Sequence, residues 1–109
     1  MARELLDLLI LDAVADDVEA TPHIAERVLR LSPKVGGPRV LARADLITAL
    51  TRLVYEHLIE GCVQTQEALV PCGDGVWPAG ELDDAWFRIT PHGLMVHGAW
   101  KLSSERETA

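Results

Sequence analysis

The sequence predicts an α+β fold that is mainly α, with three helices, a two-stranded hairpin and a short C-terminal helix. Three observations predict it. Apolar residues recur at helical spacing in three segments before residue 59. Residues prone to β structure then dominate residues 59–70 and recur near Trp86. Thr90-Pro91 finally places a helix cap and a first-turn proline directly after the second strand. We expect one domain over residues 1–103 and a polar tail over residues 104–109.

The first helix is predicted over residues 3–15, where apolar residues fall on neighbouring helical faces. Asp7 and Asp12 are expected to lie apart from this apolar set. The apolar arc is wide, which predicts a helix that is central or shared with a partner subunit. Its members are Leu5, Leu6, Leu9, Ile10, Ala13 and Val14.

Thr21-Pro22 predicts the start of the second helix, with the threonine as the cap and the proline in the first turn. This helix is expected to end near Leu31, before Ser32-Pro33. Residues 32–41 contain two prolines and a glycine pair, which predict a loop without regular structure. The buried side of the helix is predicted to consist of Ile24, Ala25, Val28 and Leu29.

The third helix is predicted from about Arg43 to about His57. Thr48 and Arg52 lie off its apolar stripe and are expected to face away from the core. The stripe itself consists of Leu46, Ile47, Leu50, Leu53, Val54 and Leu58.

The rest of the chain predicts a long hairpin and a last helix. One strand is expected from Ile59 to Val70 and a second over about 84–90, joined by a turn-rich tip over residues 71–80. Trp77, in this tip, is expected to pack back onto the hairpin or a helix; the alternative is an exposed anchor for a partner protein. The last helix is expected to be short and to cover residues 91–103.

Two motifs resemble winged helix-turn-helix regulators. Leu46-Ile47-Thr48-Ala49-Leu50-Thr51-Arg52-Leu53, followed by His57-Leu58-Ile59, resembles the third helix and its exit in PadR-like and, less closely, MarR-like proteins. Trp86-Phe87-Arg88-Ile89-Thr90-Pro91-His92-Gly93 resembles the end of their wing. His57 stands where these families usually have glycine, so we expect it in the left-handed conformation that ends a helix. The resemblance implies a winged-helix fold and a DNA-binding transcriptional regulator.

The charge distribution qualifies this implication. The net charge of −7 disfavours general affinity for nucleic acid. Residues 32–59, which hold the third helix, nevertheless carry four basic against two acidic residues, and the segments on either side are both net negative. The wing tip is predicted to be acidic and therefore a poor DNA contact; its acidic residues are Asp74, Glu81, Asp83 and Asp84.

If the domain binds double-stranded DNA, the third helix should enter the major groove. Arg43, Thr48 and Arg52 are then the predicted contacts, because arginine pairs with guanine and threonine reaches phosphate or a thymine methyl group. Lys34 and Arg39, in the preceding loop, are predicted to hold phosphates. The alternative is a solvated helix face and loop.

Neither a cofactor nor a metal is predicted. Cys62, Cys72, His92 and His97 are possible zinc ligands, but no two of them have the close spacing typical of a zinc site. The two cysteines form no disulfide framework. No nucleophile–base pattern or phosphate-binding glycine loop is present in the sequence, so we do not expect an enzyme.

The predicted function is a small cytoplasmic transcriptional regulator that acts as a homodimer. Its first and last helices would pair across a two-fold axis, so that two third helices read half-sites about one DNA turn apart. No membrane segment is expected, because the longest apolar run is short. The alternative is a protein-interaction module on the same fold, whose acidic surface suits a basic partner.

Overall fold

The computed structural model describes residues 4–37, 39–73, 75–78 and 80–108, with side chains through Lys101. Its α-helices are α1 (Leu5–Val14), α2 (Thr21–Leu31), α3 (Arg43–Tyr55) and α4 (Pro91–Thr108). Its strands are β1 (Glu19–Ala20), β2 (Ile59–Gln64), β3 (Leu69–Pro71) and β4 (Trp86–Ile89). Two short 3₁₀ helices are η1 (Ser32–Val35) and η2 (Leu82–Asp84).

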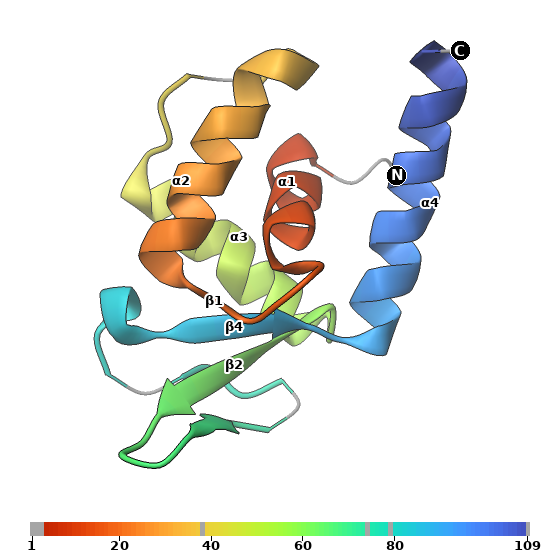
Figure 1. Cartoon of the computed structure of the whole chain (residues 1–109). Helices are drawn as coiled ribbons and strands as arrows, with labels where there is room; N and C mark the ends of the chain where they lie inside the picture. The colour runs from red at the N-terminus through yellow and green to blue at the C-terminus, as the bar shows by residue number, and fades with distance from the viewer. Residues whose placement is uncertain (1–3, 38, 74, 79, 109) are drawn as a thin grey trace.

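Helix α1 occupies the centre of the molecule, as its wide apolar arc predicts. Figure 1 shows α2, α3 and α4 around it, with the sheet across one end of the helices. No residue of α1 itself is more than partly exposed, which leaves little of this helix for contact with another molecule. The core around α1 contains Leu9, Ile10, Leu11, Ala13, Val14, Ile24, Val28, Leu46, Ala49, Leu50, Leu53, Val54, Leu58, Ile59 and Phe87.

The sheet is antiparallel, with the strand order β1-β4-β2-β3. The prediction of one long hairpin is wrong, because the chain turns at residues 65–68 rather than continuing as a strand to Val70. The Thr65 hydroxyl makes this turn: it donates to the carbonyl of Ala68 (2.8 Å) and accepts the N–H of Ala68 (3.1 Å). Strand β2 therefore pairs with β3 at its outer end and with β4 at its inner end.

The start of α2 lies at Thr21, as predicted, but Thr21 does not cap it. Ala20 occupies the cap position, and Pro22 lies in the first turn. The backbone N–H and the hydroxyl of Thr21 both donate to the carbonyl of Ala85, at 3.1 and 3.0 Å. The threonine thus ties α2 to the start of β4. In the loop that follows α2, the expectation of no regular structure is also wrong, because residues 32–35 form η1.

The junction between β4 and α4 confirms the predicted cap. The Thr90 hydroxyl accepts the N–H of Gly93 (3.0 Å) and donates to the carbonyl of His57 (2.6 Å). His57 has φ 61°, in the left-handed region, as expected for the end of α3. Helix α4 continues to Thr108, so it is longer than predicted and includes most of the expected tail. Glu105, Arg106 and Glu107, whose side chains favour helices, lie in this extension.

The observed architecture is that of a winged helix-turn-helix domain. Helices α1–α3 form the helical core, and the segment between β2 and β4, residues 65–85, is the wing. Trp77, in the wing, packs as expected: its ring centroid lies 5.7 Å from that of Phe87, although more than a third of the residue remains exposed. The wing projects away from the helices at the foot of Figure 1.

Candidate nucleic-acid interface

Helix α3 has one side in the core and one side open to solvent. Leu46, Ala49, Leu50, Leu53 and Val54 form the buried side. The solvent side, here called the outer face, consists of Ala44, Ile47, Thr48, Thr51 and Tyr55. Ile47 departs from the predicted apolar stripe, since 36% of it is exposed. These five side chains carry no charge, and the exposed charges of α3 beside them are Arg43 and Asp45 in its first turn.

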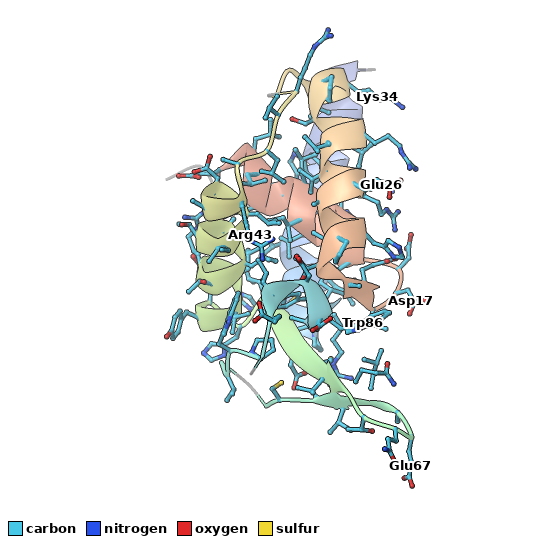
Figure 2. The ribbon with its side chains drawn as sticks, turned by 90° about the vertical axis from the view of Figure 1, so that its left-hand side faces the viewer. Asp17, Glu26, Lys34, Arg43, Glu67 and Trp86 are labelled. Carbon is cyan, nitrogen blue, oxygen red and sulfur yellow. The ribbon has the colours of Figure 1, made fainter. Side chains whose placement is uncertain are left out.

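Arg43, at the N-terminal end of α3, points toward η2 rather than away from the protein (Figure 2). Its Nη1 lies 3.0 Å from Asp83 Oδ1, and both side chains are more than half exposed. An ion pair this exposed contributes little to stability and is screened by salt. The guanidinium can consequently leave Asp83 for a phosphate or a base at small cost.

Arg52 is held much more firmly. Its Nε and Nη2 donate to the two carboxylate oxygens of Asp7, at 2.9 and 2.5 Å, and Nη2 also lies 3.4 Å from Glu4. This bidentate geometry makes an arginine–carboxylate pair stronger than a pair joined by one hydrogen bond. The hydrogen bond with Asp7 is the main reason that the pKa of Arg52 is raised above its usual value. Arg52 thereby fastens α3 to α1, and about a third of its side chain is left exposed.

The prediction for Asp7 is wrong. Asp7 is expected to lie apart from the buried apolar side chains of α1, yet it is almost completely buried. Its partner Arg52 is 45 residues away, so periodicity within α1 gives no sign of the pair. A buried carboxylate needs a partner. The presence of an acidic residue inside an otherwise apolar helix is therefore the one sign in the sequence that such a pair exists.

Thr48 is exposed on the outer face, as predicted. Its hydroxyl donates to the carbonyl of Ala44 (2.9 Å), and the Thr51 hydroxyl likewise donates to the carbonyl of Ile47 (2.7 Å). These bonds use the hydroxyl protons and leave oxygen lone pairs and methyl groups facing outward. Such a surface can accept a hydrogen bond and contact a thymine methyl group.

The two loop cations predicted to bind phosphate are both exposed, but they are separated from the wing. Lys34 lies on η1 and Arg39 in the loop before α3. Figure 2 shows Lys34 at the opposite end of the molecule from Glu67, at the tip of the wing. The structure therefore brings Arg43, Thr48 and Arg52 onto one helix, and does not bring Lys34 to the wing.

The wing has a less acidic tip than predicted. The tip consists of exposed, mostly uncharged residues from Gln64 to Ala68, with Glu67 as its one charged member. Asp83 and Asp84 belong to η2, at the base of the wing beside the start of α3, so assigning them to the tip was wrong. Asp74, also predicted there, lies outside the described residues.

The four side chains considered as possible zinc ligands have other surroundings. Cys62 and Cys72 are free thiols, and burial raises the pKa of both above the usual value. His97 Nε2 lies 2.8 Å from Asp12 Oδ1 in a largely buried contact between α4 and α1. Across the part of the chain that the structure describes, no three histidine, cysteine or acidic side chains gather in a group that could hold a metal.

This geometry defines a winged-helix domain in which one side of α3 is exposed to solvent. The chain is similar in structure to a transcriptional regulator from Clostridium thermocellum, with a TM-score of 0.58 and 17% identity over 94% of this chain and 86% of that one. At that identity the likeness establishes the fold. No family model and no curated protein matches the sequence. None of the described helices is long and apolar enough to span a membrane.

Proposed function

We propose that this protein is a DNA-binding transcriptional regulator that places α3 in the major groove. The observation that carries the proposal is the outer face of α3, which stays exposed while the opposite side of the same helix fills the core. An α-helix fits the major groove, and a recognition helix needs one such free face. The fold shared with a transcriptional regulator supports this assignment.

The predicted contact residues receive different roles. Thr48 is the proposed base contact at the centre of the outer face, and Arg43 is the proposed phosphate contact once it leaves Asp83. Lys34 and Arg39, both exposed in the segment between α2 and α3, are proposed to hold phosphates. Arg52 is proposed to act mainly as a positioning residue, because Asp7 fixes its guanidinium.

We further propose a homodimer that uses α4 more than α1. The first and last helices were both expected in the interface, but no residue of α1 is more than partly exposed. On α4, by contrast, Leu94 is 48% and Met95 74% exposed. Apolar side chains at this exposure suit a helix that pairs with its copy. Two α3 helices would then reach half-sites about 34–36 Å apart.

Fluorescence anisotropy with labelled genomic fragments, at several salt concentrations, tests the proposal. We expect salt-sensitive binding, and we expect Lys34→Ala to flatten the plot of log affinity against log salt by about 0.9. Thr48→Ala should weaken binding to the preferred fragment by more than it weakens binding to others. Arg30→Ala is the matched control, since Arg30 pairs with Glu26 on α2, away from the outer face (Figure 2). An absence of salt-sensitive binding to every fragment contradicts the proposal.

A second candidate function is a protein-interaction module, and the neutral outer face favours it. Tyr55 is 69% exposed at the end of this face, and tyrosine is common at the centres of protein interfaces. The net charge of −7 suits a basic partner. Recovery of a stable protein partner that Tyr55→Ala releases, together with no DNA binding, would select this candidate over the first.

A further inference from the structure

A cleft of about 410 Å³ opens between α1, α2, the loop after η1, and α3. This volume lies within the range of about 300–1,000 Å³ that is typical of small-molecule sites. The walls are mainly aliphatic and come from all of these elements: Leu5 and Leu9 from α1, Leu29 from α2, and Leu41 from the loop. We propose that this cleft binds a small amphipathic cation, with an apolar body between the leucines and a protonated amine at the rim.

The charge of the rim selects a cation. Glu4, Asp45 and Arg52 line the cleft, and Arg52 is already paired with Asp7 and Glu4. Its positive charge is therefore more than balanced by the carboxylates around it. Asp45 is exposed, and its carboxylate makes no hydrogen bond or ion pair with any described residue. The negative rim attracts a ligand with an ammonium group and repels a ligand with a carboxylate.

The lining of the cleft also includes a buried polar group without a hydrogen-bond partner. Ser32 lines the cleft, and its hydroxyl oxygen is buried with no hydrogen-bond partner among the described residues. A Cβ added at Gly37 would lie 2.2 Å from this oxygen and 3.2 Å from Leu5 Cδ2, so the loop packs closely against this part of the cleft. An unpaired buried hydroxyl is unfavourable, and a polar atom on the ligand body would be favoured beside it.

The cleft shares a wall with the proposed DNA contacts. Asp45, Thr48 and Arg52 lie on successive turns of α3 and all line it. A ligand that contacts Thr48 would compete with a base or phosphate at the same side chain. Ligand and DNA should therefore each lower the affinity for the other by the same factor. This last step rests on the proposed function, whereas binding to the cleft does not.

The test uses octylamine, octanol and nonanoate, which share one octyl chain and differ in charge. Titration calorimetry on the full chain should show the amine binding about threefold or more tightly than the alcohol, with the carboxylate weakest. Amide chemical shifts should change around Leu5, Leu29 and Thr48. Asp45→Asn should remove the preference for the amine, while Glu67→Gln, at the distant wing tip, should leave it intact.

Equal binding of all three compounds overturns the proposal, as does an equal loss of the amine preference in Glu67→Gln. Chemical-shift changes scattered over the acidic surface overturn it as well, because they indicate general attraction of a cation. Circular dichroism of each variant confirms that the fold is retained. Amine binding without DNA binding overturns the proposed function alone, and DNA binding without amine binding overturns the cleft alone.

Discussion

The junction between β2, β4 and α4 and the wing differ in how they are fixed. At the junction, the Thr90 N–H and hydroxyl donate to the carbonyls of Leu58 (3.1 Å) and His57 (2.6 Å), and Leu58 is fully buried. The wing tip, by contrast, is held mainly by strand pairing and by the Thr65 turn, and its residues are exposed. Several groups therefore determine the junction together, while the wing can change shape locally without disturbing the core.

Gly93→Ala should break the junction and gives the largest expected effect. A Cβ at this position would lie 2.0 Å from the Leu58 carbonyl oxygen and 2.7 Å from Ile89 Cγ1. Backbone cannot move aside as a flexible side chain can, so we expect a loss of about 3 kcal/mol in the free energy of unfolding. Urea denaturation measures it. A loss below about 1 kcal/mol would mean that the junction adapts as easily as the wing.

Asp7→Ala tests a third attachment, between α3 and α1. Removing a buried carboxylate leaves Arg52 without its main partner. Because about a third of the Arg52 side chain is exposed, water can compensate part of the loss, and we expect a cost of about 2 kcal/mol rather than the larger value of a fully buried pair.

Glu26→Ala is the control for Asp7→Ala, since it breaks the exposed pair with Arg30. It should change the free energy of unfolding by less than about 0.5 kcal/mol in the same denaturation assay. Similar effects of the two substitutions would show that the bond between α1 and α3 contributes no more than a surface ion pair.

Gly61→Ala, in β2, introduces the same chemical change as Gly93→Ala at a position that faces the wing. The added Cβ would lie 2.4 Å from Pro78 Cγ, a ring atom in the wing rather than backbone of the core. The loop that carries Pro78 can shift, so we expect a loss of about 1 kcal/mol. Amide chemical-shift changes should stay within residues 61–87. A cost equal to that of Gly93→Ala would remove the distinction between the two regions.

Gly98→Ala should give the smallest effect, and in the opposite direction. Apart from the neighbouring residues and backbone of α4 itself, no atom of the described residues lies within 4 Å of a Cβ built at this position. Alanine favours a helix interior over glycine, so we expect a gain of about 0.5–1 kcal/mol in the free energy of unfolding. Thermal denaturation measures it, and a loss would indicate a contact on this side of α4.

Local patterns in the sequence predicted the elements whose causes are local. The leucine spacing predicted α3, Thr90-Pro91 predicted the start of α4, and the position of His57 predicted its left-handed backbone. The hairpin boundary was missed, because the strand pattern was extended through residues 64–68 to Leu69 and Val70, and only the hydroxyl of Thr65 marks the turn. The two-residue strand β1 was missed because it exists only through pairing with β4.

The candidate site was predictable only in part, for the same reason. That Thr48 would lie exposed on α3 followed from helical periodicity, and the exposure of Lys34 followed from its loop. The partners of Arg43 and Arg52 lie 40 and 45 residues away, where periodicity carries no information. The cleft was not predicted at all, since its walls come from four segments that meet only in the folded chain.

The contact between His97 and Asp12 has a mechanical consequence for α4. It is the last polar contact described along this helix, at 2.8 Å, and the backbone runs on from there to Thr108. Trp100, one turn further on, still packs against the core. The eight residues after Trp100 extend about 12 Å, so a tilt of about 5° there displaces the end of α4 by about 1 Å. Small changes at these contacts with α1 and the core are therefore largest at the C-terminal end of α4.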